Sequence, residues 1–155
     1  MIARCVAGPG VQSPQLRITS AVVRRAIADA ETLLQSRGPT SAVDRVHTTL
    51  HGYLKVSCDD AGIVYGTDPS ILDLFKLLKQ HHPRLHSLGA HQGPIVQVLR
   101  SFGSMMDALN PARNRGSVAH PNEKLLDADE AMLFINAART VLQYLDTKLG
   151  GPSVG

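Results

Sequence analysis

Apolar residues recur at intervals of three and four along most of this chain, which is the spacing of one face of an α-helix. The first such stretch, residues 21–36, follows Thr19 or Ser20, and either hydroxyl can cap a helix. Its apolar positions lie at spacings of four, three and four: Val23, Ile27, Ala30 and Leu34. Gly38-Pro39 predicts the end of this first helix.

Four further stretches continue the pattern. Thr40 or Ser41 can cap a second helix that ends near Gly62, with the apolar positions Val43, Val46, Leu50 and Leu54. Pro69 suits the first turn of a short third helix, "SILDLFKLLKQHH", which Pro83 closes. Its inward candidates are Ile71, Leu74 and Leu78, with Phe75 and Leu77 beside them.

A connector rich in His and Gly, "PRLHSLGAHQG", precedes a fourth helix that bends or stops at Asn110-Pro111. The apolar positions of this helix are Ile95, Val96, Leu99, Phe102, Met106 and Leu109. Asp127 and Glu130 predict the start of the last helix, because they lie three residues apart as in a capping box. Its apolar seam spans about five turns of 3.6 residues: Ala131, Ile135, Ala138, Leu142, Leu145 and Leu149.

These elements predict an all-α protein, an antiparallel bundle of four to five helices. The composition agrees, because the chain has three Tyr, three Phe and no Trp, and its core must be built from aliphatic residues. At 155 residues we expect one domain over 18–149, between a flexible arm over 1–17 and a flexible tail over 150–155.

Charge and cysteines narrow the class of protein only slightly. Lys plus Arg outnumber Asp plus Glu by 16 to 13, which permits nucleic-acid binding without requiring it. Cys5 and Cys58 form neither a disulfide framework nor a CxxC motif, so we expect free thiols and a cytoplasmic location. No segment approaches the roughly 18 uninterrupted apolar residues of a membrane span, and we expect no membrane association.

The junction between the last two predicted helices, "NPARNRGSVAHP", concentrates side chains suited to phosphate chemistry. An arginine offers two-point contact to a phosphate, and a histidine with an ordinary pKa of about 6.5 moves protons at neutral pH. Arg113 and His120 could therefore hold a phosphodiester and transfer its proton without a metal. Alternatively, both arginines merely cap the last carbonyls of a helix, and His120 makes a local turn hydrogen bond.

The same junction resembles the signature of HEPN domains, an Arg followed by a polar residue and then by a His four to six residues after the Arg. Here these are Arg113, Asn114 and His120. The blocks "RVHTTLHGYL", "ILDLFKLLKQHHPRL", "DALNPARNRGSVAHPNEKLL" and "AMLFINAARTVLQYLDTKL" together resemble the abortive-infection C-terminal family, a HEPN-like group, from about residue 20 to 149.

The resemblance implies a metal-independent endoribonuclease of a phage-defence or toxin system, or a relative that has lost catalysis and only binds RNA, a nucleotide or a protein. It assigns Arg113 to the scissile phosphate, His120 to proton transfer and Asn114 to orienting the site. Arg115 also satisfies the spacing to His120, but Gly116 then replaces the polar residue. We expect Arg115 and Lys124 to bind RNA beside the motif.

The resemblance also has implications for partners. It implies RNA and a second copy of the chain, with an antitoxin or another defence-system protein as a further partner, and neither cofactor nor metal. One HEPN subgroup carries a modifiable Tyr two residues after the His, but Asn122 stands there. The apolar surplus of the last helix also favours a homodimer: Met132, Leu133, Phe134, Val141 and Tyr144.

Other candidates have ordinary explanations. His47 and His51, four residues apart, could share a metal, but with no third ligand nearby we expect surface or packed histidines. Four histidines flank Pro83 and Gly89, where we expect a solvated connector: His81, His82, His86 and His91. We expect Cys58 to be a buried apolar side chain and not a nucleophile.

Overall fold

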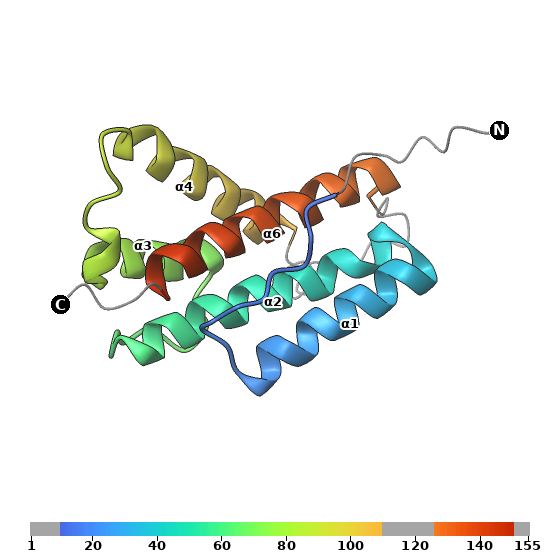
Figure 1. The fold of residues 1–155 in the computed structure, drawn as a ribbon, viewed down its shortest axis with the longest axis horizontal. Coiled ribbons are helices and arrows are strands. Elements are labelled where there is room, and N and C mark those ends of the chain that lie inside the picture. Colours follow the sequence, from blue (N-terminus) through green and yellow to red (C-terminus); the bar gives the residue numbers. More distant parts are fainter. Residues whose placement is uncertain (1–9, 110–125, 151–155) are drawn as a thin grey trace.

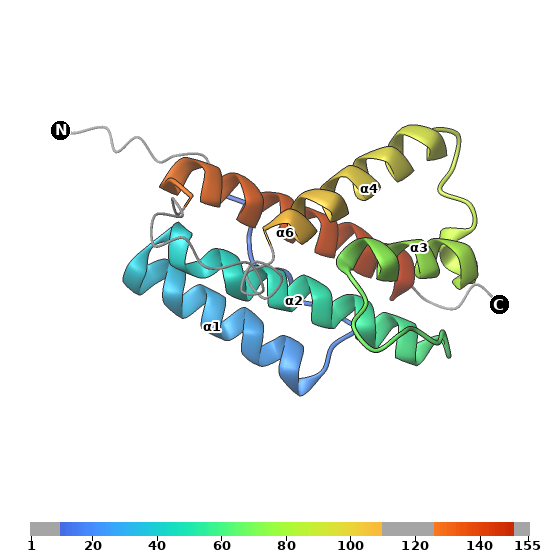
Figure 2. The ribbon, with the colours of Figure 1, turned by 180° about the vertical axis from the view of Figure 1, so that it is seen from behind.

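The computed structural model of the chain describes residues 10–109 and 126–150. Within these ranges it contains five α-helices and one 3-10 helix. They are α1 (Ala21–Arg37), α2 (Pro39–Asp60), α3 (Ile71–His81), η1 (Pro83–Leu85), α4 (Gln92–Ala108) and α6 (Ala128–Leu149). The helices pack as a bundle in which α2 contacts α1, α3 and α6 (Figures 1 and 2). The predicted all-α class is confirmed.

The first two helices form a tight antiparallel hairpin (Figure 1). Ser20 caps α1, its hydroxyl accepting the backbone N–H of Val23 at 3.2 Å. Gly38 makes the turn with a φ of 89°, a conformation that residues with a side chain rarely adopt. The predicted caps of the second helix, Thr40 and Ser41, were wrong, because Pro39 supplies a preset φ at the first helical position and α2 begins there.

The core lies where α2, α3 and α6 meet. Tyr53 and Leu50 of α2 and Leu74 of α3 are almost fully buried. All six residues of the seam predicted for the last helix are buried as well: Ala131, Ile135, Ala138, Leu142, Leu145 and Leu149. The periodic pattern therefore identified the buried face of α6 correctly.

Two helix starts differ in detail from the prediction. Pro69 lies outside α3, because Ser70 is the N-cap and forms a capping box with Asp73. Asp127 is the N-cap of α6, but its side chain makes no capping hydrogen bond, so the capping box predicted with Glu130 is wrong. The acidic side chains in the first turn of α6 remain favourably placed for the helix dipole.

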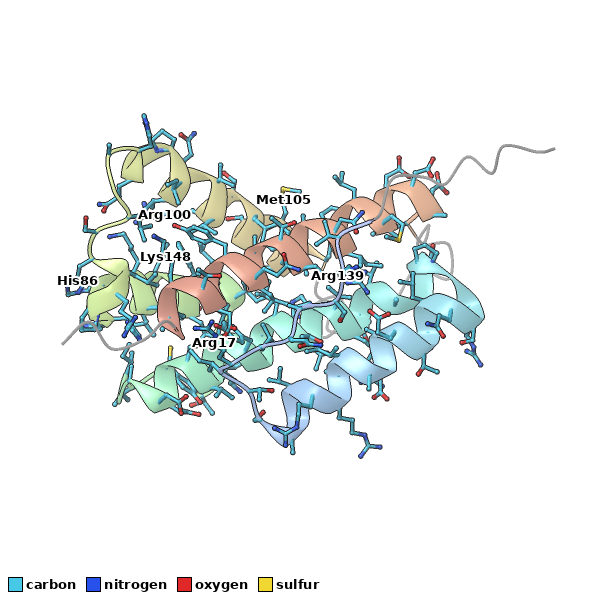
Figure 3. The ribbon with its side chains drawn as sticks, in the orientation of Figure 1. Arg17, His86, Arg100, Met105, Arg139 and Lys148 are labelled. Carbon is cyan, nitrogen blue, oxygen red and sulfur yellow. The ribbon has the colours of Figure 1, made fainter. Side chains whose placement is uncertain are left out.

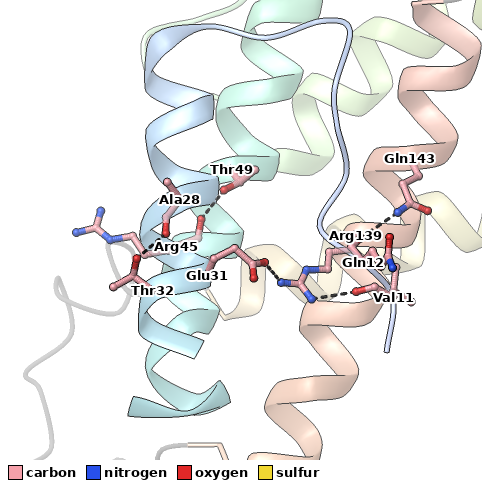
Figure 4. A network of polar contacts seen from close by, with 9 residues as sticks. All are labelled: Val11, Gln12, Ala28, Glu31, Thr32, Arg45, Thr49, Arg139 and Gln143. Carbon is pink, nitrogen blue, oxygen red and sulfur yellow. Dashed lines mark hydrogen bonds and ion pairs between the residues drawn. The ribbon is translucent and has the colours of Figure 1, made fainter. Parts of the chain in front are cut away.

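Residues 10–18 run across α6 and α2 to the start of α1 (Figure 1). We call this segment the strap. Arg139 donates to the carbonyl of Val11 at 2.9 Å, and Gln143 donates to the carbonyl of Gln12 at 3.0 Å (Figure 4). The described part of the arm expected over residues 1–17, from residue 10 onward, is thus hydrogen-bonded to α6, while the boundaries of the domain remain a prediction.

Candidate functional site

The five residues predicted for the site lie outside the described residues: Arg113, Asn114, Arg115, His120 and Lys124. The structure does describe both ends of the junction that contains them, Leu109 after α4 and Leu126 before α6. The structure therefore shows which contacts fix the two ends of the junction in the bundle.

The α4 end of the junction is held by a carboxylate. Asp107, in the last turn of α4, accepts the backbone N–H groups of Ile71 at 2.8 Å and Leu72 at 3.0 Å. A carboxylate at a helix C-terminus is unfavourable, because the dipole is negative there, whereas the N-terminus of α3 attracts it. Asp107 thus ties the end of α4 to the start of α3.

The α6 end of the junction is held elsewhere in the fold. The hydroxyl of Thr40, in the first turn of α2, donates to the carbonyl of Leu126 at 2.7 Å. The start of α6 therefore lies beside the turn between α1 and α2, whereas the end of α4 lies near the middle of α6 (Figures 1 and 2). The junction connects two well-separated points of the bundle.

His47 and His51 lie on α2, on the side where α3 begins. Their rings are stacked with centroids 6.1 Å apart and an interplanar angle of 18°. Nε2 of His51 lies 2.8 Å from the carbonyl oxygen of Pro69, so this nitrogen carries the proton and donates. His47 is buried. His51 thus ties α2 to the segment that leads into α3. No cluster of three metal-ligating side chains is found among residues 10–109 and 126–150.

The family can be assigned from the sequence as a whole. The chain matches the Abi_C family, described as a HEPN-like domain, over residues 21–148. It belongs to the Abi_C family of HEPN-like domains. No curated protein and no solved structure gave a significant match.

The match covers all the described helices of this HEPN-like domain except the last residue of α6. It also includes the whole junction between α4 and α6. The strap, by contrast, lies before it. In the part of the chain that the structure describes, no helix has both the length and the apolar character that a membrane span needs.

The connector before α4 is more ordered than expected, because its start forms η1 and buries Leu85. Nδ1 of His82 accepts the backbone N–H of Arg84 at 3.2 Å, which caps η1. Burial lowers the pKa of His82, and the neighbouring Arg84 and His86 lower it further. The lowered pKa favours the neutral His82 ring, the form in which Nδ1 can accept this N–H group.

An apolar groove of about 320 Å³ lies between the first half of α4 and the second half of α6. Two of its lining residues, Thr140 and Tyr144, carry hydroxyl groups, and the others are apolar: Pro94, Ile95, Val98, Leu99 and Val141. The two helices approach each other at the end of α4 and diverge toward its start (Figure 1). Burial raises the pKa of the Tyr144 hydroxyl. Sequence reasoning missed this groove, since periodicity does not give the angle between two helices.

Sequence reasoning also missed two buried charged residues of α6, Arg139 and Asp146. Arg139 forms an ion pair with Glu31 of α1 (Figure 4). Arg139, Gln143 and Asp146 lie at spacings of four and three and so form a polar stripe on one face of α6. This stripe is the signal in the sequence by which the buried charges could have been found. Their partners on the strap lie about 130 residues away along the chain, so the pattern alone could not identify them.

Cys58 agrees with its prediction. The side chain is fully buried, and burial together with Asp59 raises the pKa of the thiol to about 11. Because the thiolate is the reactive form, this cysteine is a poor nucleophile at neutral pH.

Proposed function

We propose that this HEPN-like domain is a metal-independent endoribonuclease of a phage-defence or toxin system. The observation that carries the proposal is the motif Arg113-Asn114 followed by His120, within the range that matches the Abi_C family. The motif stands between two helices whose ends are anchored to different parts of the bundle.

In the proposed reaction the 2′-hydroxyl of the RNA attacks the adjacent phosphorus. A new 2′-oxygen–phosphorus bond forms, the bond from phosphorus to the 5′-oxygen breaks, and the products are a 2′,3′-cyclic phosphate and a 5′-hydroxyl. His120 transfers the proton between these oxygens, Arg113 offsets the charge that grows on the phosphate, and Asn114 orients the site. General acid–base help contributes about 10²–10⁴-fold and one charge-stabilising donor about 10²–10³-fold, which suffices for a modest nuclease.

The proposal extends to the partners of the domain. Arg115 and Lys124 would add phosphate contacts next to the motif. A homodimer would place two motifs around one cleft, and an antitoxin or another defence-system protein would restrain the activity in the cytoplasm. Two facing copies would exclude water, which strengthens each phosphate contact.

RNA cleavage with excess chelator present tests the proposal. We expect the wild type to release fragments with cyclic phosphate ends and His120→Ala to lose cleavage while keeping its helical circular dichroism spectrum. His91→Ala is the matched control, since His91 is exposed and lies at the other end of α4. Equal cleavage by wild type and His120→Ala would refute the proposal.

A catalytically silent domain that binds RNA is the second candidate. It is favoured by the stretch Leu74–Met106, which contains no Asp or Glu and carries four Lys or Arg residues. Such a domain would bind RNA with a strong salt dependence and never cut it. The same assay, run beside a binding measurement, distinguishes the two functions.

A further inference from the structure

Three cations of α3 and α4 lie on the sides of these helices that face each other. Gly103 of α4 lies so close to α3 that a Cβ atom added to it would stand 3.6 Å from the Cα of Leu72. Arg100 precedes Gly103 by three residues and so lies on the side of α4 that makes this contact, as Figure 3 shows. Lys76 and Lys79 follow Leu72 by four and seven residues, which places them on the matching side of α3.

These cations stand beside the opening between the two helices. From the contact of Leu72 with Gly103, α3 and α4 separate toward the connector that joins them (Figure 2). Arg100 and Lys76 each lie about one helical turn of 5.4 Å from the contact, and Lys79 lies about two turns from it. Their long side chains can therefore reach one ligand that lies along the opening. We call Lys76, Lys79 and Arg100 the basic edge.

No ion pair neutralises the charge of the basic edge within the part of the chain that the structure describes. Lys76 and Arg100 are exposed, and the stretch Leu74–Met106 contains no Asp or Glu. The acidic residues of the same two helices, Asp73 and Asp107, accept backbone N–H groups at the start of α3. The basic edge therefore presents a local excess of positive charge, which attracts anions.

A surface that is positive but not apolar suits a nucleic acid better than an acidic protein. Protein–protein interfaces are built around an apolar core, whereas nucleic-acid interfaces are more polar and more positively charged. The exposed large apolar residues of α4, Val98 and Met105, lie two and five residues from Arg100 and so on the opposite side of the helix. Among the described residues, α3 has no exposed large apolar side chain.

We propose that the basic edge binds the phosphate backbone of the RNA on which the motif acts, with cations of both helices on one strand. The inference rests on the proposed function, because it takes RNA as the ligand, and it adds a binding surface outside the motif. Contacts from Lys and Arg to phosphates position a strand but do not read its sequence. The basic edge therefore holds RNA of any sequence.

The basic edge also lies close to the start of the junction. From Arg100 to Leu109, the last described residue before the junction, α4 advances about 14 Å at 1.5 Å per residue. Asp107 lies on the same side of α4 between them, but its two oxygens accept N–H groups of α3. A strand held at the basic edge thus reaches the start of the junction within a few nucleotides.

The first test measures binding of a fluorescent single-stranded oligouridylate to the full chain carrying His120→Ala, which keeps the RNA intact. In this parent, Lys76→Gln/Arg100→Gln is compared with Arg24→Gln/Arg25→Gln, which removes two charges from exposed residues of α1. Each phosphate contact of a single strand contributes about 0.7 to the slope of log affinity against log salt, so the edge pair should reduce this slope by about 1.4. We expect it to weaken binding about tenfold, equally for oligouridylate and oligoadenylate, and the control pair to change neither quantity.

The second test separates substrate binding from chemistry in the otherwise wild-type chain. Lys76→Gln/Arg100→Gln should raise the KM of RNA cleavage about tenfold and leave kcat unchanged, because the lost contacts hold the strand equally before and during the reaction. The control pair should leave both constants unchanged.

Three results, obtained with melting temperatures retained, would overturn the inference. The first is an unchanged salt slope in the edge pair, and the second is an equal loss of affinity in the edge and control pairs. The third is an edge pair that keeps its affinity for RNA but loses binding of a fluorescent polyglutamate peptide, which would assign the basic edge to an acidic protein. If the parent protein binds no RNA and the wild type cuts none, the proposed function fails as well. Wild-type cleavage with any of the three results removes this inference alone, whereas edge-dependent binding without cleavage removes only the nuclease.

Discussion

A single carboxylate joins three parts of the fold that are distant in sequence. Asp146 of α6 is buried and accepts the backbone N–H groups of Arg17 at 2.8 Å and Ile18 at 3.1 Å. It also accepts the hydroxyl of Tyr53 on α2 at 3.0 Å. Burial raises the pKa of Tyr53, and the Asp146 carboxylate raises it further. Three hydrogen-bond donors thus stabilise the buried carboxylate.

Replacing Asp146 by Ala should therefore cost substantial stability. The change leaves the buried Tyr53 hydroxyl and two strap N–H groups without their acceptor, and hydrogen bonds to a charged group contribute about 1.5–3 kcal/mol each. Allowing for relaxation of the strap, we expect the free energy of unfolding to fall by roughly 2–4 kcal/mol in urea titrations. Thr147→Ala, at the exposed neighbouring position, should change it by less than about 0.5 kcal/mol. Similar losses in both variants would show that the carboxylate has no special role.

At the scale of the helices, the corner between α3 and α4 determines where the junction begins. Two carboxylates accept backbone N–H groups at the start of α3, but they belong to different helices. Asp73 is part of α3 and closes its capping box, whereas Asp107 comes from the last turn of α4. Only the second contact fixes α4 relative to α3.

This difference allows a matched comparison of Asp107→Asn and Asp73→Asn. Both remove a charge that favours the N-terminus of α3, so both should destabilise the domain by about 1–2 kcal/mol in urea titrations. Asp107→Asn should in addition lower the kcat of the proposed RNA cleavage about tenfold or more, because small displacements of catalytic groups have large effects on rate. Equal kcat values in the two variants, measured where both are fully folded, would contradict this coupling.

Much of the helical framework was predictable from local signals. The spacing of apolar residues gave the buried seam of α6. Thr19 or Ser20 was the predicted cap of α1, of which Ser20 is the one used, and Gly38 marked the end of the helix. The start of α2 was misplaced because Pro39 begins the helix immediately after a glycine turn, which frees the nearby hydroxyl of Thr40 to bind Leu126. Such a contact joins residues 86 positions apart and leaves no periodic pattern.

At the scale of the whole molecule, the candidate site was predicted from the residues of the junction and their resemblance to the HEPN signature. The residues that surround it, including Asp107 and the groove, depend on helix angles and contacts over long sequence separations. The charged residues are also divided between two regions of the chain. The stretch Leu74–Met106 is free of acidic residues, whereas Asp127, Asp129 and Glu130 gather at the start of α6. On the α4–α6 side of the molecule, acidic residues are thus concentrated at the start of α6.

The predicted homodimer is best tested on the part of this side that lies beyond the groove. Met105 of α4 is 44% exposed and Leu133 of α6 is 61% exposed, although both are large and apolar. Leu133 is eight residues before Val141 and so lies on the same side of α6, the side that faces α4. Met105 stands four residues before Leu109, next to the junction, and Figure 3 places it beside α6. Apolar side chains exposed here would be buried if two junctions faced each other.

Introducing a charge at these positions should therefore separate the two copies. We expect the wild type to scatter light as a dimer of the 16.6 kDa chain, and Met105→Asp/Leu133→Asp to scatter as a monomer with an unchanged helical spectrum. The carboxylates would be desolvated in the interface but remain in water in the monomer, which shifts the equilibrium toward the monomer. Val64→Asp is the control, because Val64 is 88% exposed in the loop between α2 and α3 and should leave the mass of the dimer unchanged. A wild type that is monomeric at micromolar concentration, or a double variant that remains dimeric, would exclude this surface as the contact.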